Sequence, residues 1–412
     1  MSARRGAAVA ALVLAAAAPA GAAHAAGAGD KIAFGTSAGI TVVAGDLAAA
    51  PQVVLPRGEW PSWSPDGTRL AFTRMSPPDG LGIAGADGSS PAVLTTTPVA
   101  TTEAEAQAPG FFGDLMPSWS PDGTHLAFLR ATLRGSDVWT VAADGSGARR
   151  LVAAAGPDHA DTDPHYLADG SRIRFEGGGD LWDVRPDGSR LRRVAAVGRL
   201  DAVSAPDGSA YALTQPGGPV YMVDYVGGGL RAVAGAGRMP IAFSRNGARL
   251  LVGTLNDAKA RGAVIDLAGH RPPQPVAATE QGLAGAAFGA PAWWTPAPRQ
   301  PFRAADDREA PESVLSDAHG RLVALRRDRP RTVTANQIDT TLATVDQTGI
   351  RAISVAWVQG RERPRWQDVT KSGAFEGTLH RGPGTYRLLV RATDVLGHTT
   401  KRPSEVIVKL TP

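Results

Sequence analysis

The 412-residue sequence contains no cysteine. Disulfides, thiol catalysis and cysteine-ligated metals are therefore excluded, and stability has to come from buried side chains and hydrogen-bonded strands. Long apolar runs are also missing. After the first 18 residues, no stretch approaches the roughly 18 to 20 apolar residues that a membrane-spanning helix needs. The sequence thus predicts no membrane span.

The charge balance lacks a strong excess of either sign. There are 43 basic and 39 acidic residues, which gives a formal net charge of +4. Without the two arginines of the N-terminal segment, 41 basic residues face 39 acidic ones, or +2. An excess this small does not predict nucleic acid as a partner.

Residues 1–25 are typical of an export signal. The pair Arg4-Arg5 supplies the positive end, an apolar run covers residues 7–18, and residues 23–25 (AHA) resemble a small-x-small cleavage site. We therefore expect an exported protein that is periplasmic, associated with the cell envelope, or extracellular. Gly6 stands where the twin-arginine signal has an apolar residue, so both export routes stay open.

Eight residues, PSWSPDGT, stand at 61–68 and again at 117–124. Proline presets φ, aspartate bonds its own backbone and glycine accepts a positive φ, so the segment predicts a tight turn between two strands. One tryptophan precedes each turn and an apolar run follows it, which predicts a hairpin whose aromatic side chain packs against a neighbour. Looser copies centre on the steps Asp169-Gly170, Asp207-Gly208 and Asn246-Gly247.

A second predicted hairpin follows each copy, as at residues 138–151. Together the hairpins make five four-stranded units between residues 61 and 278, a repeat length typical of propellers. A sixth unit is divided: residues 30–55 supply three strands, and residues 286–293 supply the missing innermost strand. Such closure removes an exposed sheet edge. We predict an all-β, six-bladed β-propeller closed by strands from both ends of the ring.

The Trp-Ser-Pro-Asp-Gly-Thr-x-Leu-Ala-Phe copies resemble the repeats of the TolB-like, WD-repeat-like β-propellers. The resemblance covers about residues 30–296 and implies six or so blades. In exported bacterial members it implies binding of a protein or another ligand over the funnel face. The chain departs from the pattern at Ser204, which replaces the aromatic residue, and at Arg245-Asn246, which replaces Pro-Asp.

The last quarter of the chain has a different pattern. Residues 297–305 form a proline-containing linker, and residues 306–412 contain about seven short strand patterns, as in a β-sandwich. Within them, residues 382–394 (GPGTYRLLVRATD) resemble a late strand of bacterial immunoglobulin-like or fibronectin-like modules. The predicted domains are a signal peptide at 1–25, a propeller at 26–296, the linker, and an immunoglobulin-like β-sandwich at 306–412.

Two motifs could carry catalytic or metal-binding chemistry, but each can also be interpreted as an ordinary loop. Residues 35–39 (GTSAG) fit the nucleophile elbow G-x-S-x-G, but they join two strands with no helix to carry a triad, so we interpret them as a loop. Residues 158–165 (DHADTDPH) are either a polar loop or the site of a divalent cation. No other cofactor is predicted. The candidate metal ligands are His159, Asp161, Asp163 and His165.

Residues 97–116 form the longest connection between predicted blades, and a connection this long is usually either functional or disordered. Blade order places it on the same funnel face as several inner-strand entries. These segments together make up the predicted ligand-binding face. Its candidate residues are Glu59, Trp60, Phe111, Phe112, Asp114, Asp161, Asp163, His165, Asp201 and Arg238.

These observations favour an exported, non-catalytic binding or scaffold protein whose funnel face engages a protein or a cell-wall component. The alternative is a metal-assisted lyase or hydrolase that acts on polysaccharide or a small ester, with the Asp/His cluster in the central channel. A third interpretation is a passive surface or adhesion element in which the tail binds.

Overall fold

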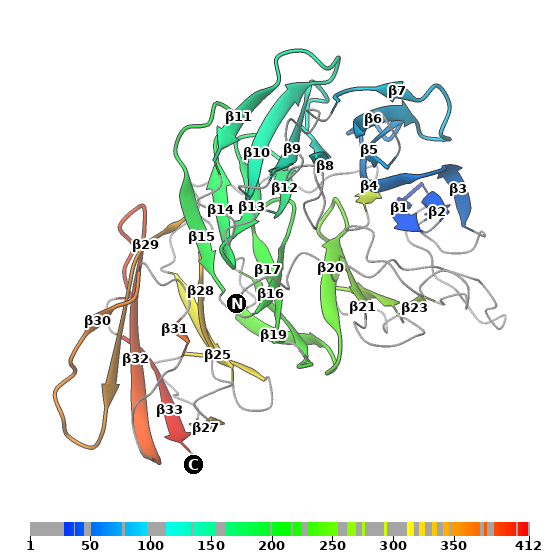
Figure 1. Cartoon of the computed structure of the whole chain (residues 1–412). Coiled ribbons are helices and arrows are strands. Elements are labelled where there is room, and N and C mark those ends of the chain that lie inside the picture. The colour runs from blue at the N-terminus through cyan, green and yellow to red at the C-terminus, as the bar shows by residue number, and fades with distance from the viewer. Residues whose placement is uncertain are drawn as a thin grey trace. The chain divides into compact units, whose positions relative to one another are not determined.

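The computed structural model shows an all-β protein (Figure 1). It describes residues 29–36, 38–44, 51–75, 79–96, 113–132, 135–153, 162–197, 200–215, 217–224, 229–253, 262–268, 274–276, 292–294, 311–316, 321–325, 332–335, 341–346, 348–370, 375–376, 383–400 and 403–410. Within these ranges every regular element is a strand, and no helix is long and apolar enough to cross a membrane.

The chain divides into two compact units. Unit 1 comprises Met1–Gly178, Val184–Leu191 and Ile241–Pro301, and unit 2 comprises Gly179–Asp183, Arg192–Pro240 and Phe302–Pro412. The second unit thus groups strands of the repeat region with strands of the tail. The domain boundaries predicted from the sequence stay a prediction.

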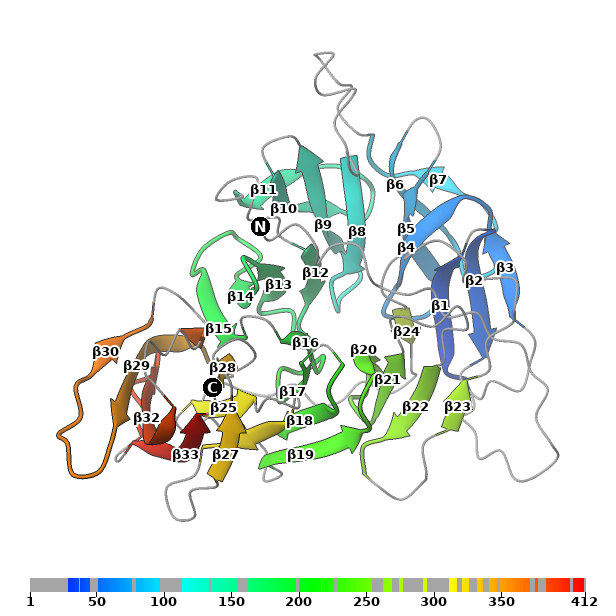
Figure 2. The ribbon, with the colours of Figure 1, turned by 60° about the horizontal axis from the view of Figure 1, so that its bottom comes forward.

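Unit 1 is built from antiparallel sheets, and most of them have four strands in the order of the chain. In Figure 2 the sheet containing β4 and the sheet containing β8 lie side by side. The strands of this unit are β1 (Lys31–Thr36), β2 (Gly39–Ala44), β3 (Gln52–Leu55), β4 (Gly58–Trp63), β5 (Arg69–Arg74), β6 (Gly80–Gly85), β7 (Ala92–Val93), β8 (Gly113–Trp119), β9 (His125–Thr132), β10 (Gly135–Ala142), β11 (Arg149–Val152), β12 (Thr162–Tyr166), β13 (Ile173–Gly177), β20 (Met239–Phe243), β21 (Arg249–Gly253), β22 (Gly262–Asp266), β23 (Gln274–Val276) and β24 (Ala292–Trp294).

The repeated eight residues fold as predicted. In the first copy the Gly67 N–H donates to the Ser64 carbonyl at 2.9 Å, and the Ser64 hydroxyl donates to Asp66 Oδ1 at 2.5 Å. Gly67 has a φ of 69°, which only glycine adopts without strain. The second copy repeats these bonds from Ser120 to Asp122. These bonds explain why the serine, aspartate and glycine of the turn recur in both copies.

The tryptophan of each copy packs between neighbouring sheets. Trp63 lies in one core cluster with Ile40 of the preceding sheet and Phe72 of its own. Trp119 shares a cluster with Leu81 of the preceding sheet and Phe128 of its own. The position of both tryptophans between two sheets agrees with the packing role predicted from the repeat.

Strand β24 completes the sheet that begins near the N-terminus. It pairs antiparallel with β1, with Trp293 opposite Ile32, which gives the strand order β24-β1-β2-β3. The sequence placed the missing innermost strand in this region, so the predicted pairing is confirmed. The successive four-stranded sheets confirm the propeller type of fold, whereas the number of blades and the closure of the ring stay predictions.

Unit 2 contains the remaining strands. They are β14 (Asp180–Val184), β15 (Arg192–Ala196), β16 (Asp201–Ser204), β17 (Ala210–Thr214), β18 (Val220–Asp224), β19 (Gly229–Ala234), β25 (Glu312–Ser316), β26 (Leu322–Ala324), β27 (Thr332–Ala335), β28 (Thr341–Val345), β29 (Ile350–Val358), β30 (Gln367–Asp368), β31 (Phe375–Glu376), β32 (Gly384–Asp394) and β33 (Ser404–Leu410). Strand β14 ends one residue beyond the bound of this unit, and the first two residues of β20, Met239 and Pro240, belong to this unit.

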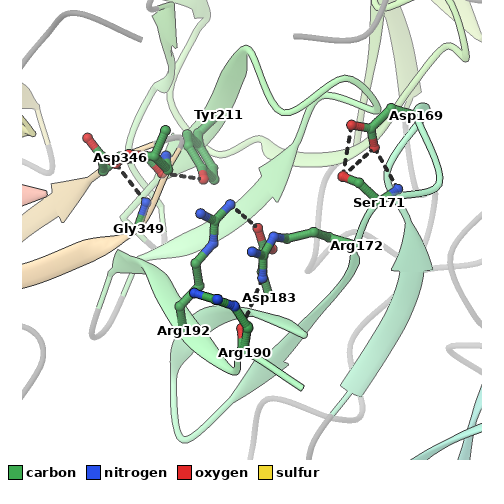
Figure 3. A network of polar contacts seen from close by, with 10 residues as sticks. Asp169, Ser171, Arg172, Asp183, Arg190, Arg192, Tyr211, Asp346 and Gly349 are labelled. Atoms are coloured by element: carbon green, nitrogen blue, oxygen red, sulfur yellow. Dashed lines mark hydrogen bonds and ion pairs between the residues drawn. The ribbon is translucent and has the colours of Figure 1, made fainter. Parts of the chain in front are cut away.

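The tail continues the sheet of β15. Strand β28 pairs antiparallel with β15, with Val345 opposite Ala195, and β25 and β26 follow. The Tyr211 hydroxyl donates to the Asp346 carbonyl at 3.0 Å, and Figure 3 shows the tyrosine pointing at that residue. In the same view Arg192 reaches Asp183 at 3.3 Å. The tail strands therefore cover what would otherwise be the free edge of β15.

A second tail sheet has the order β27-β33-β32-β29-β30. Its residues Val355, Leu388 and Val408 share one buried cluster with Leu315 and Leu342 of the first tail sheet. The two sheets thus enclose a common core, as in a sandwich. The likeness to immunoglobulin modules in particular stays a prediction.

Candidate functional site

Three neighbouring inner strands of unit 1 carry the same irregularity. On β4, β8 and β12 the pairing with the next strand shifts register, between Glu59 and Ser62, between Leu115 and Ser118, and between Thr162 and His165. One residue inside each shift has a left-handed φ: 45° at Trp60, 53° at Met116 and 50° at Asp163. A proline follows each of them. These are β-bulges with strained, non-glycine residues.

Hydrogen bonds between the sheets hold the three bulges at corresponding positions. The Trp119 N–H donates to Ser62 Oγ at 3.3 Å, and the Tyr166 N–H donates to Ser118 Oγ at the same distance. The Met116 N–H donates to Thr73 Oγ1 at 3.1 Å. The inner strands therefore run in register with one another. We call the bulged residues and those before them the bulge rim: Glu59, Trp60, Leu115, Met116, Thr162 and Asp163.

The bulge rim differs from the repeat in how its sequence is constrained. From Pro61 and Pro117 onward, the first two copies have eight identical letters, whereas the rim residues before them differ in every copy. The backbone is nevertheless the same at all three bulges. The fold thus fixes the rim geometry without fixing the rim side chains. Of these side chains Asp163 is exposed and Met116 is half-buried, so these two are accessible to a ligand, whereas Glu59, Trp60 and Leu115 are buried.

Glu59 is the most unusual rim residue. Its side chain is only 6% exposed, and Oε2 has no hydrogen-bond partner among the described residues. Burial alone raises the pKa of this carboxyl to about 7. The residue opposite Glu59 on β5 is Thr73, whose hydroxyl accepts the bond from Met116. A carboxyl that is buried without a partner is unfavourable for folding and points to another role.

Asp114 is held by an internal partner. The Arg130 guanidinium contacts both of its carboxylate oxygens, at 2.7 and 2.8 Å, and Asp114 is 1% exposed. The same guanidinium lies 4.2 Å from the centre of the Trp139 ring. This arrangement neutralises and positions Arg130, so the Asp114 carboxylate is engaged inside the sheet rather than directed to a ligand.

The other predicted site residues fall into three groups. Trp60 is buried, Asp163 is exposed, and His165 is half-buried with Nδ1 3.1 Å from the Asp163 carbonyl. Unit 2 contains half-buried Asp201 on β16 and half-buried Arg238 just before β20. The predicted residues outside the described part of the chain are Phe111, Phe112, His159 and Asp161.

The predicted metal site lies only partly within the described residues. Of its four candidate ligands, Asp163 and His165 are described. Among the described residues, no three His, Asp or Glu side chains gather in a way that could hold a metal ion. The cation site at 158–165 stays a prediction.

Sequence reasoning found Glu59, Trp60 and Asp163 from their place before an inner strand, but it missed the bulges. A signal was present, because each bulge precedes a proline in a strand that lies at the end of its sheet. Within sheets, proline is found at edge strands, at strand starts or at bulges, so a local irregularity is one of the expected solutions.

No protein-family model matches the chain. Among solved structures it is similar to TolB from Acinetobacter baumannii, with a TM-score of 0.49 and 18% identity over 64% of this chain and 67% of that chain. It is also similar to a chain of the nidogen/laminin complex, with a TM-score of 0.49 and 12% identity over 65% and 99%. A putative TolB from Agrobacterium tumefaciens gives 0.37 and 19% over 50% and 82%. Two of these three structures are thus TolB proteins.

Proposed function

We propose that this chain is an exported, non-catalytic binding protein whose bulge rim engages a protein or cell-envelope ligand. The observation that carries the proposal is the repeated left-handed residue at Trp60, Met116 and Asp163. Strain of this kind is unfavourable by about 1 to 3 kcal/mol per residue, and it gathers where a fold presents side chains to a ligand.

Packing alone does not account for every rim residue. Trp63 and Trp119 fill the space between sheets and recur in the copies, as packing residues should. Asp163, in contrast, is exposed on a strained backbone, and it belongs to no core cluster of the described residues. A ligand-facing role accounts for both its exposure and its variability.

The alternative, a metal-assisted lyase or hydrolase, stays a prediction. Its candidate residues include His159 and Asp161, which lie outside the described part of the chain. No observation within the described residues favours it over binding.

Capture of partners from envelope extracts by the immobilised full chain tests the proposal. The informative variants are Met116→Gly and Asp163→Gly, because glycine accepts the left-handed φ and removes only the side chain. We expect weaker capture with an unchanged or higher free energy of unfolding.

The matched controls are Asp87→Ala and Asp144→Ala, which change exposed aspartates in outer turns of the same unit. They should capture the partner like the unmodified chain. Equal capture by the rim variants and the controls would show that the ligand binds elsewhere.

A further inference from the structure

We propose that Glu59 is the receiving carboxylate for an alkylammonium group of the ligand, namely a lysine side chain of a protein partner. The inference rests on the proposed function, because it identifies the ligand group recognised at the bulge rim. Binding transfers the proton of Glu59 to solvent, and the ionised carboxylate then pairs with the ammonium.

The first support is the state of Glu59 in the free protein. It lies beside the strained residue Trp60, more than nine-tenths buried, with Oε2 lacking a partner among the described residues. Two other buried carboxylates among the described residues have a cationic partner by contrast: Asp114 is held through both oxygens by Arg130, and Asp30 is paired with Arg249. With respect to the described residues, Glu59 Oε2 is thus an acceptor without a donor, which an incoming cation can supply.

The second support is the surroundings of Glu59. The strands packed against β4 are β1, β2, β5, β8 and β24, and β2 and β24 contain no charged residue. The other three strands, β1, β5 and β8, contain charged groups. None of these groups has a resolved effect on the Glu59 carboxyl, whose pKa is raised by burial alone. They are Lys31, which lies over the Trp63 ring, Arg69, which lies over Trp119, Arg74, and Asp114, which is paired with Arg130.

The third support is the shape of the required ligand. A slender group suits a carboxyl this deeply buried, and the planar fork of a guanidinium binds best when both carboxylate oxygens are open on one side. Lysine has a compact ammonium on an apolar stem that can lie along buried surface. An amino sugar would have to bury its ring hydroxyls as well.

The binding should depend on pH in a defined direction. With a pKa of about 7, Glu59 is mostly protonated at pH 6 and mostly ionised at pH 8, while lysine stays charged throughout. A ligand that pairs only with the carboxylate should bind about tenfold more tightly at pH 8 than at pH 6. It should release about 0.9 proton per site at pH 6 and about 0.1 at pH 8.

The experiment titrates the full chain with the peptide acetyl-Gly-Lys-Gly-amide and follows the Glu59 side-chain carbon by NMR. Calorimetry in two buffers of different ionisation enthalpy measures the released proton. Glu59→Gln should lose both the binding and the proton release, whereas Asp87→Asn, a change in an exposed turn, should keep both. The peptide with an acetylated lysine should not bind.

Three results would overturn the inference: no binding of the lysine peptide, binding independent of pH, or equal binding to Glu59→Gln. Binding of glucosamine in place of the peptide would also overturn it and would assign the carboxyl to an amino sugar. Failure here leaves the proposed function standing if Asp163→Gly still weakens capture. If capture is also unchanged, the proposed function fails as well.

Discussion

The Arg249 guanidinium lies 2.9 Å from the Asp30 carboxylate, across 219 residues of chain. Asp30 precedes β1 and Arg249 begins β21, so the pair joins two sheets of unit 1. A second bond, from Arg245 Nη1 to the Pro65 carbonyl at 2.5 Å, joins β20–β23 to the first repeated turn. Both arginines come from the copy in which Arg245-Asn246 replaces Pro-Asp.

Arg249→Met should lower the free energy of unfolding by about 2 to 4 kcal/mol, because it leaves Asp30 charged and buried without its partner. Urea unfolding measures the change. Adding Asp30→Asn should recover part of the loss. The exposed pair Arg150–Asp137 is the control, and Arg150→Ala should change stability by less than about 1 kcal/mol. Similar effects of the two arginine variants would contradict the importance of the Asp30 pair.

Trp63→Ala and Trp119→Ala should each lower the free energy of unfolding by about 3 to 5 kcal/mol, since each opens a cavity between two sheets. Urea unfolding followed by circular dichroism provides the measurement. Trp366→Ala, which removes a partly buried tryptophan of the tail, is the comparison and should have a smaller effect. An unchanged midpoint of urea unfolding for Trp63→Ala would refute its role in packing between the two sheets.

Acid should destabilise the repeated turns between about pH 4 and pH 2. Hydrogen bonds from the Ser64 and Ser120 hydroxyls and from backbone N–H groups lower the pKa of Asp66 and Asp122 to about 2. A lowered folded-state pKa gives stability that is present above the unfolded value and is lost as pH falls through the folded value.

The variant Asp66→Asn with Asp122→Asn should flatten the acid limb of the stability curve. Asn246 shows that asparagine can take this place, because its Oδ1 accepts from the Ser244 hydroxyl at 2.7 Å and from the Ala248 N–H at 3.1 Å. An acid limb of the same slope in the double variant would contradict the assignment.

Glu59→Gln should stabilise the protein at pH 8 by about 1 to 3 kcal/mol and leave it unchanged at pH 4. The folded-state pKa of about 7 lies above the ordinary value of 4.5, so the unfavourable effect of Glu59 on stability grows as pH rises through this window. Thermal unfolding at the two pH values checks the sign. A variant that is less stable at pH 8 would mean that Glu59 has a stabilising partner.

A chain that ends before residue 306 should lose stability and associate. Val314, Leu322, Ala343 and Val345 of the tail share a core with Tyr211 and other residues of the repeat region. Their removal exposes that core and the edge of β15. Light scattering and circular dichroism of the truncated chain test this expectation. The milder variant Tyr211→Phe should lower stability by about 1 kcal/mol through loss of the bond to Asp346.

The sequence predicted the features that local chemistry determines. The turn letters of residues 61–68 predicted hairpins, and the missing inner strand was placed where β24 lies. The pairing of β15 with β28 was not predictable, because the sequence of an edge strand does not specify which other strand will pair with it. Among candidate site residues, position alone indicated Glu59 and Asp163, whereas the internal partner of Asp114 depends on the register of β8 against β9.

The serines of the repeat bear on how repeat units can be added to such a chain by duplication. Ser62 accepts the N–H of Trp119, and Ser118 accepts that of Tyr166, so each hairpin brings both the acceptor for its successor and the donor for its predecessor. A unit with both halves of its own joint can be duplicated in tandem, and the new copy fits at once. The two identical octets are what a recent duplication of this kind would leave behind.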